Sequence, residues 1–253
     1  MKKKNFYWSV LAILIVAVMG EGLVSCNKNE KDEESVTNGL EIENQNIPSE
    51  LCGTWYPVAI KGADKTFNYL TINSNGLMDI SSPLQNGETL LYKGKCYYNK
   101  NIIETYLNQT GGQWYKDAYD YEIIEWNSTI LIIGKSLAHF LSKTKNDYFS
   151  FIGKERDSQL IGTWQYHQTS NATSTLTLRA DGTGVDTFLS NVDHSSKIIE
   201  SWFTRNGYYY VMYENDNTYN VYRYNAYGNS FDLVGLDVVS LGSQYDRRSY
   251  IKQ

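Results

Sequence analysis

Few residues of this 253-residue chain have the types and spacings that catalysis or metal binding requires. The three histidines, His139, His167 and His194, are far apart, and none stands at a metal-ligand spacing from another His or a Cys. Asp193 and Ser195 flank His194, but adjacent residues on a loop rarely reach the geometry of a catalytic dyad. We therefore expect no metal site, no cofactor and no enzymatic activity.

Two carboxylates, Glu122 and Glu125, could be considered as a glycosidase pair, because glycoside hydrolysis needs two carboxyl groups on either side of the scissile bond. They lie in one strand-like run, and alternation along a strand sends them to opposite faces. We therefore expect that they do not act together.

Aromatic residues are unusually dense between Trp202 and Tyr227, with ten rings in 26 residues. One face of a sheet cannot bury them all, so some should meet solvent or a cavity, and the amphipathic Tyr side chain suits a sugar ring or a small amphiphile. The alternative is that Tyr serves merely as a strand-forming residue on both faces. The candidate binding residues are Trp202, Tyr208, Tyr210, Tyr222 and Tyr224, with Trp114 and Trp126 as a weaker counterpart.

The amino terminus has the pattern of a secretion signal. Lysines at positions 2–4 precede an apolar run of 14 residues, which is shorter than the roughly 20 that a spanning helix needs. Residues 23–26, Leu-Val-Ser-Cys, resemble the bacterial lipobox, which implies a signal peptide over residues 1–25 and lipidation of Cys26. An ordinary secreted protein with a chance cysteine is the alternative.

An acidic tether is expected over residues 26–49. Residues 27–50 carry seven acidic residues and two lysines, which leaves residues 51–253 at a net charge of −2 out of −5 for the chain. A nearly neutral body argues against nucleic acid as a partner. Asn27 after the lipobox favours the outer membrane, and residues 31–34 resemble an acidic surface-export tag, with a plain solvated tether as the alternative.

Two further cysteines, Cys52 and Cys96, lie in the first half of the folded body. An extracytoplasmic compartment permits a disulfide between them, whereas two buried thiols are the competing interpretation. The sequence leaves both open.

The phrase Leu-x-Gly-Thr-Trp occurs twice, at residues 51–55 and 160–164, which indicates an internal duplication. Further anchors follow in order, with spacings of 109 for Trp55 and Trp164, 106 for Gly76 and Gly182, 101 for Gly134 and Gly235, and 99 for Phe151 and Tyr250. We expect one lobe over residues 50–155 and a second over 159–253, joined by residues 154–159.

Each lobe is expected to be all-β. Turn dipeptides at 75–76, 181–182 and 206–207 predict hairpins between alternating runs. Lobes of about 100 residues hold seven or eight short strands, and an antiparallel meander closed into a barrel would hide their edges. Residues 136–141 are expected to form a single helical turn capped by Ser136.

The Gly-Thr-Trp opening, the early hairpin and an Arg-bearing last strand resemble the lipocalin-like, or calycin, group in a short tandem form. The resemblance implies that Trp55 and Trp164 plug the closed ends of two barrels, and that Arg247 or Arg248 lies across Trp164. The first lobe has no arginine at the matching place. We place Arg248 in this structural role.

The expected function is therefore that of a lipoprotein anchored in the outer membrane, which binds a glycan or a small amphiphile without catalysis. A structural or protein-interaction subunit of an outer-membrane assembly, with filled barrels and no small ligand, is the alternative.

Overall fold

The computed structural model describes residues 46–61, 67–84, 86–108, 114–144, 152, 154–236 and 247–253. The expected signal peptide, Cys26 and nearly all of the expected tether lie outside the described residues.

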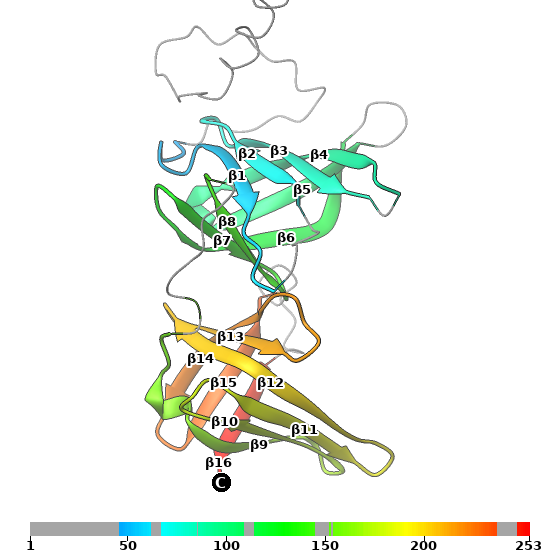
Figure 1. Ribbon diagram of the computed structural model, residues 1–253, viewed down its shortest axis with the longest axis vertical. Helices are drawn as coiled ribbons and strands as arrows, with labels where there is room; N and C mark the ends of the chain where they lie inside the picture. The colour runs from blue at the N-terminus through cyan, green and yellow to red at the C-terminus, as the bar shows by residue number, and fades with distance from the viewer. Residues whose placement is uncertain are drawn as a thin grey trace, which may run out of the picture.

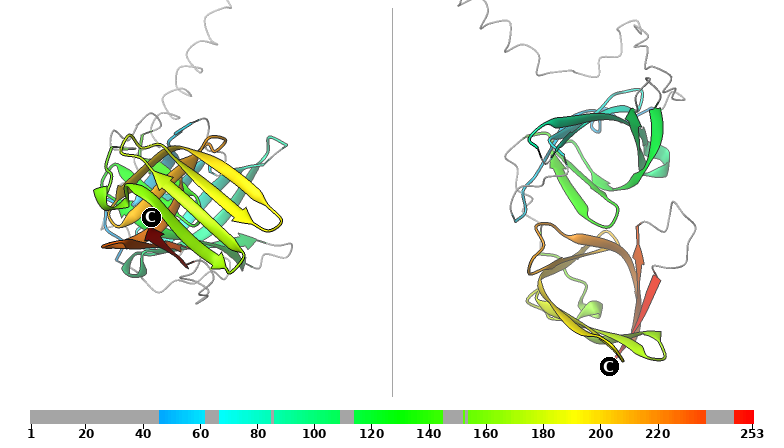
Figure 2. Two further views of the ribbon diagram at one scale, coloured as in Figure 1. Left: turned by 90° about the horizontal axis from the view of Figure 1, so that it is seen from below. Right: turned by 90° about the vertical axis from the view of Figure 1, so that its right-hand side faces the viewer.

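The chain folds into two closed eight-stranded antiparallel barrels, one after the other, as Figures 1 and 2 show. The first comprises β1 (Gly53–Pro57), β2 (Tyr69–Ile72), β3 (Leu77–Pro83), β4 (Thr89–Tyr97), β5 (Ile102–Asn108), β6 (Trp114–Trp126), β7 (Ile130–Gly134) and β8 (Ala138–Ser142). The second comprises β9 (Gly162–Thr169), β10 (Ala172–Leu178), β11 (Gly184–Ser190), β12 (His194–Arg205), β13 (Tyr208–Tyr213), β14 (Asn220–Tyr227), β15 (Ser230–Gly235) and β16 (Arg247–Lys252). Two 3₁₀ turns, Tyr98–Lys100 and Ser158–Leu160, are the helical elements of the described chain. The expected all-β tandem meander is confirmed.

The predicted turn residues lie at hairpin corners. Gly76 and Gly182, which connect the second and third strands of each barrel, have φ values of 87° and 91°. Asn206 and Gly207 connect β12 to β13 with φ values of 51° and 80°, as a tight hairpin turn with positive φ at both central residues requires.

The repeated phrase has the same role in both barrels. Trp55 Nε1 donates to the Leu51 carbonyl at 2.9 Å, and Trp164 Nε1 donates to the Leu160 carbonyl at 2.8 Å. Both indole rings are fully buried. Each Trp therefore joins the segment before its barrel to the barrel core.

The cation over each Trp is a lysine, so the expectation that Arg248 lies across Trp164 is wrong. Lys252 Nζ is 5.1 Å from the Trp164 ring centroid, and Lys143 Nζ is 4.9 Å from that of Trp55. Arg247 pairs instead with Asp232 on the neighbouring strand, and the side chain of Arg248 lies inside the second barrel. The first barrel, expected to have no cation there, has one in the corresponding place.

The segment expected to form a helical turn is strand β8, which closes the first barrel by pairing with β1. All five of its residues are buried. Leu141 packs in the barrel core while Phe140 packs against the second barrel, so both faces are covered and the usual polar alternation is absent.

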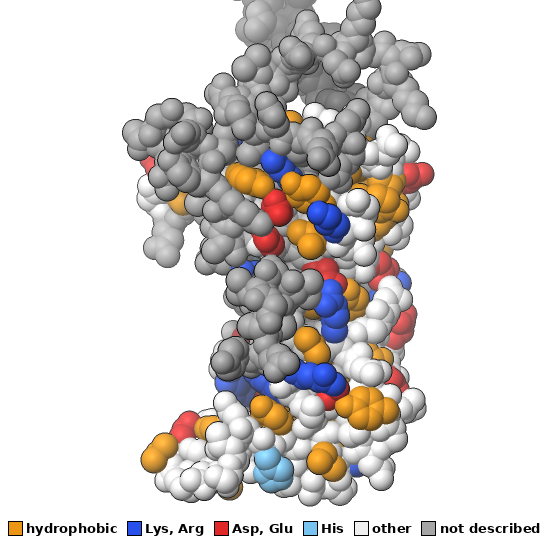
Figure 3. Space-filling model, turned by 180° about the vertical axis from the view of Figure 1, so that it is seen from behind, with side chains coloured by type: hydrophobic (Ala, Val, Ile, Leu, Met, Phe, Trp, Pro, Cys, Tyr) orange, Lys and Arg blue, Asp and Glu red, His pale blue; other side chains and the backbone are white. Residues whose placement is uncertain are grey.

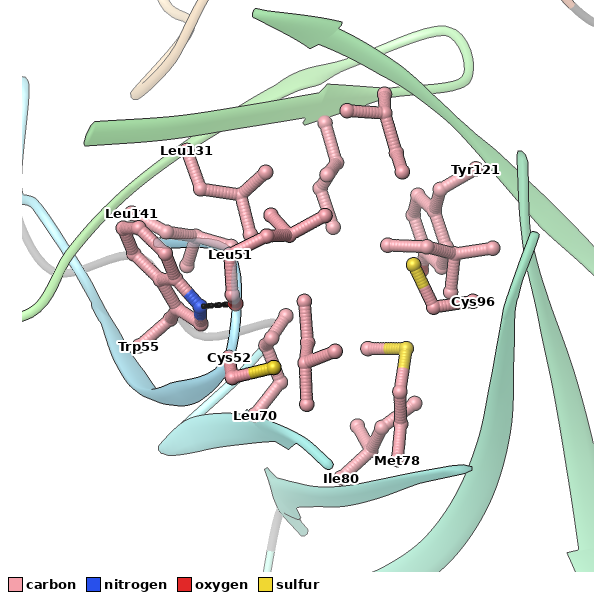
Figure 4. Packing of buried hydrophobic residues seen from close by; sticks show 14 of the residues in the cluster. Leu51, Cys52, Trp55, Leu70, Met78, Ile80, Cys96, Tyr121, Leu131 and Leu141 are labelled. Carbon is pink, nitrogen blue, oxygen red and sulfur yellow. Dashed lines mark hydrogen bonds between the residues drawn. The ribbon is translucent and has the colours of Figure 1, made fainter. Parts of the chain in front are cut away.

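An apolar core fills the first barrel (Figure 4). Its members include Leu51, Trp55, Leu70, Met78, Ile80, Ile103, Ile123, Leu131 and Leu141. Cys52 and Cys96 belong to the same core as buried thiols with their sulfurs apart, so the possible disulfide is not formed. Burial raises the pKa of the Cys96 thiol to about 12, as expected for an inert core cysteine.

The two barrels meet in a continuous interface. Its apolar part contains Ile132, Ala138 and Phe140 of the first barrel and Phe203, Tyr210, Tyr219 and Val221 of the second. Backbone hydrogen bonds cross it, from the Ala138 N–H to the Tyr219 carbonyl at 2.8 Å and from the Val221 N–H to the Ser136 carbonyl at 2.9 Å. Figure 3 shows charged side chains of both signs at the level where the barrels meet.

Candidate functional site: a polar cavity in the second barrel

The aromatic residues that were expected to bind a ligand lie largely inside the protein. Trp202 is fully buried in the core of the second barrel, where its indole N–H donates to the Arg179 and Thr183 carbonyls at 3.0 and 3.2 Å. Tyr210 is fully buried at the interface between the barrels, stacked on Phe203 with ring centroids 4.4 Å apart. Neither ring can meet a ligand from solvent, so their assignment as binding residues is wrong.

Tyr208 also belongs to the interface. Its hydroxyl donates to Glu122 of the first barrel, and burial, followed by that hydrogen bond, raises its pKa to about 12. Tyr208 is therefore not available to a ligand, because the first barrel covers the outer face of β13. The sequence of one lobe alone does not reveal that the other lobe covers this face.

The remaining candidate binding residues lie in different parts of the molecule. Tyr224 donates to Asp157 at 3.2 Å beside the segment that leads into the second barrel. Trp126 packs against the first core, with its ring 5.7 Å from that of Tyr98. Trp114 lies at the start of β6, and its side chain is outside the described residues. Tyr222 lines a cavity inside the second barrel.

The second-barrel cavity has a volume of about 720 Å³ and occupies the interior at the end of the barrel away from Trp164. Along β9 the alternating residues Tyr166 and Gln168 line it, and the β13–β14 turn forms part of its rim. The inward-facing lining consists chiefly of Tyr166, Gln168, Ser174, Asp186, Phe188, Lys197, Tyr213, Tyr222 and Arg248. Most of these side chains are polar or aromatic.

Strand registers show why the first barrel is filled at the corresponding positions. In the first barrel the paired inward residues of successive strands are Trp55, Leu70, Ile80 and Tyr92. In the second they are Trp164, Leu176, Asp186 and Lys197. Asp186 and Lys197 thus replace an isoleucine and a tyrosine of the first barrel.

The last strands of the two barrels also differ in this way, with a charged inward residue in the second barrel. His139 pairs with Ile133 in the first barrel, as Arg248 pairs with Leu233 in the second. His139 packs edge-on against Phe67 and Tyr121, with ring centroids 5.0 and 5.6 Å away. This aromatic group closes the first barrel where the second is hollow.

Asp186 is the central charged group of the second-barrel cavity. Its Oδ2 accepts a hydrogen bond from the Tyr213 hydroxyl at 3.1 Å. Burial raises its pKa above the ordinary value, although the Tyr213 hydrogen bond and the positive charges of Arg248 and Lys197 oppose the shift. Lys197 Nζ also lies 5.3 Å from the Tyr213 ring centroid. Lys197 is exposed and Arg248 is half-buried, and both line the cavity beside Asp186.

Two buried tyrosines, Tyr209 and Tyr250, lie next to residues that line the cavity. Tyr250 stacks on Phe231 with ring centroids 4.9 Å apart, and Arg248 donates a hydrogen bond to the Tyr250 hydroxyl. The hydroxyl of Tyr209, close to Tyr250 and Asp186, is buried with no hydrogen-bond partner among the described residues. Burial first, then these neighbours, raises the pKa of Tyr209 well above its usual range, so this hydroxyl stays protonated as a donor.

The carboxylate pair of β6 is engaged at the interface. A β-bulge between Ile123 and Glu125 breaks the alternation, so the expectation that Glu122 and Glu125 face opposite ways is wrong. Glu125 accepts two hydrogen bonds from Arg205, at 2.7 and 2.9 Å, and Glu122 accepts one from Arg223 at 2.5 Å. Both carboxylates of the first barrel therefore form ion pairs with arginines of the second barrel.

The histidines remain apart, with His139 in the first barrel, His167 on β9 beside Thr173 at 3.1 Å, and His194 at the start of β12. In the described part of the chain no cluster of three or more His, Cys, Asp or Glu side chains is placed to hold a metal ion. The described residues also contain no helix long and apolar enough to cross a lipid bilayer.

No family model, curated protein or solved structure matches the chain. The second-barrel cavity is therefore the feature of the molecule that bears most directly on function. Sequence reasoning missed Asp186, Lys197 and Tyr213 as site residues. The duplication contained a signal for Asp186, because the 106-residue spacing of Gly76 and Gly182 aligns it with Ile80, a charged residue in place of a core residue.

Proposed function

We propose that the protein is a non-enzymatic binding protein of the cell envelope, and that its second barrel binds a saccharide. The observation that supports this most strongly is the contrast between the filled first barrel and the polar cavity of the second. A filled barrel with a closed core is sufficient for stability, so the charged interior of the second barrel has no evident structural purpose.

A saccharide fits this lining better than an apolar chain does. Sites for apolar ligands are lined mainly by hydrophobic side chains, whereas Ser174, Gln168, Asp186 and Lys197 offer hydrogen-bonding groups. The rings of Tyr166 and Tyr222 add flat apolar faces with hydroxyl edges, which suit a sugar ring. Between the two ligand classes expected from the sequence, we therefore favour the glycan.

The architecture supports the same placement. Two closed meander barrels, each with a buried Trp near its first strand, agree with the lipocalin-like resemblance of the sequence. That resemblance implies a ligand inside a barrel, at the end away from the Trp, as proposed for the second barrel here.

Binding can be tested by placing a bulky side chain in the second-barrel cavity. Residues 27–253, without the lipid, are screened on a saccharide array, and the hits are measured by calorimetry. Ser174→Trp, which fills part of the cavity, should weaken binding by at least about tenfold. Thr175→Trp, on the opposite face of β10, is the matched control and should bind as the wild type does. Equal binding by both variants would place the ligand elsewhere.

We further propose that Cys26 anchors the protein in the outer membrane through its lipid, with residues 27–49 as the tether. Cys26→Ser cannot form the thioether and should move the protein from the membrane fraction to the soluble fraction. Fractionation with metabolic labelling by a fatty-acid analogue measures this. Retention of the variant in membranes would refute the anchor.

The alternative, an interaction subunit of an envelope assembly, has one observation in its favour. Leu84, Leu90 and Leu91, around the β3–β4 hairpin of the filled barrel, are exposed, with Leu91 65% accessible. Exposed apolar groups of this kind occur at protein contact sites. A saccharide screen without hits, together with a stoichiometric envelope partner in a pull-down, would favour this function over the one proposed.

A further inference from the structure

We infer that the free edge of β12 pairs with the same edge of a second copy of the chain, which joins two molecules in a two-fold symmetric dimer. The pairing is an antiparallel addition of strand to strand through the backbone. Such a dimer goes beyond the proposed saccharide binding and does not depend on it.

Strand β12 is longer than the strand that follows it. It pairs with β11 from His194 onward, whereas in the described part of the chain its ladder with β13 begins at Ile199. Residues 194–198 therefore have a neighbouring strand on one side, and all five are exposed. Figure 1 shows this end of the β11–β12 hairpin projecting from the second barrel, at lower right.

The direction of the backbone groups along this edge follows from one hydrogen bond. The Glu214 N–H donates to the Ile198 carbonyl at 3.1 Å, from the side of β13. Because the backbone groups of alternate residues in a strand point to the same side, those of Ser196 and His194 also point away from β11. No backbone group of another described residue meets them there.

Open space lies along the same edge. The lining of the second-barrel cavity includes every residue from Ser195 to Ile198, although alternate side chains of a strand point to opposite faces. The cavity therefore reaches the edge of β12 and not only its inner face. A free strand edge is a template for pairing with another strand, and proteins usually cover or interrupt such edges.

A second copy fits this edge because the sequence around Ser195 is self-complementary. In an antiparallel pair centred on Ser195, His194 of each copy lies opposite the partner's Ser196, and each such pair exchanges both backbone hydrogen bonds. The same register sets Lys197 opposite the partner's Asp193. Facing opposite charges are stabilising, whereas a register centred on Lys197 would set two lysines against each other.

Exposed apolar side chains at the end of the hairpin agree with this register. Val192 and Ile198 are 96% and 54% exposed. Pairing centred on Ser195 brings Val192 of each copy beside the partner's Ile198, so apolar surface leaves water twice in the dimer. So short a pairing buries less surface than a permanent dimer does, and we expect reversible association at micromolar to millimolar concentrations.

Sedimentation velocity of residues 27–253, from about 5 μM to about 500 μM, tests the dimer. The wild type should pass from monomer towards dimer over this range. Ser196→Pro removes an N–H that points to the free edge, where proline is tolerated, and should weaken association by at least about tenfold. Ser196→Ala keeps this N–H and is the matched control, which should associate within about twofold of the wild type.

Reversal of the two charges tests the register. Asp193→Lys and Lys197→Asp should each weaken association by at least about threefold, because like charges then face each other, and the double variant should restore it. A wild type that stays monomeric throughout, or a dimer that Ser196→Pro leaves intact, would overturn the inference. A dimer that the double variant does not restore would overturn the register. Circular dichroism verifies that each variant is folded, and the saccharide screen tests the proposed function separately.

Discussion

Replacement of Trp164 by alanine is expected to lower the free energy of unfolding of the second barrel by about 4 kcal/mol. The ring is fully buried, meets Phe231 edge-on at 4.8 Å, and donates a hydrogen bond to Leu160. Truncation therefore leaves a large cavity and removes the bond that fixes the entering segment. Urea unfolding followed by circular dichroism measures the change.

The repeat makes this prediction specific. Trp55→Ala should cost the first barrel a similar amount, because Trp55 has the same hydrogen bond and the same overlying lysine. Trp126→Ala is the control, since its ring is only partly buried, and it should cost about 1–2 kcal/mol. A Trp164→Ala variant as stable as Trp126→Ala would contradict the role given to the repeated phrase.

Replacement of Arg205 by alanine is expected to destabilise the joined barrels by about 3 kcal/mol. Arg205 forms a bidentate pair with Glu125 across the interface, and their side chains are 22% and 14% exposed. Its removal leaves a largely buried carboxylate without its main partner. Urea unfolding should show a lower midpoint, with the two barrels less tightly coupled.

A double-mutant cycle separates the pair from simple truncation. Removing both charges, as Glu125→Leu with Arg205→Met, should recover much of the loss, because no unpaired charge remains. Lys93→Ala, which breaks an exposed pair with Asp79, should cost less than about 1 kcal/mol. If Arg205→Ala costs as little as Lys93→Ala, the ion pair does not hold the barrels together.

Local signals in the sequence were sufficient to predict the architecture. The repeated phrase at 51–55 and 160–164 identifies two equivalent lobes, and dipeptides such as Asn206-Gly207 place hairpins where positive φ is needed. Both signals depend on residues close together in the chain, so they can be interpreted without knowledge of tertiary contacts.

The errors arise where one barrel changes the environment of the other. Strand β8 has no alternation of buried and exposed residues, because the second barrel covers Phe140. Tyr208 and Tyr210 lie in the interface because the first barrel covers them in turn. The lysines over the two Trp rings were not predicted, because the lipocalin-like resemblance implies an arginine at that place.

The site itself was out of reach for a different reason. Asp186, Lys197 and Tyr213 come from three strands, and single charges in alternating runs look like ordinary solvent-facing residues. Only the closure of the barrel turns them inward. The spacing of Gly76 and Gly182 aligns Asp186 with Ile80, but the equivalence of Lys197 and Tyr92 depends on strand registers that spacing alone does not define.

Chemical-shift mapping with the saccharide that binds most tightly in the array screen tests most directly whether the second barrel holds the ligand. Backbone amide signals of residues 27–253 are followed during the titration. We predict that the largest changes occur at Asp186, Lys197, Tyr213 and Tyr222, with little change at Ile80 in the first barrel. Largest changes in the first barrel, or on the outer surface of the second, would contradict the proposed site.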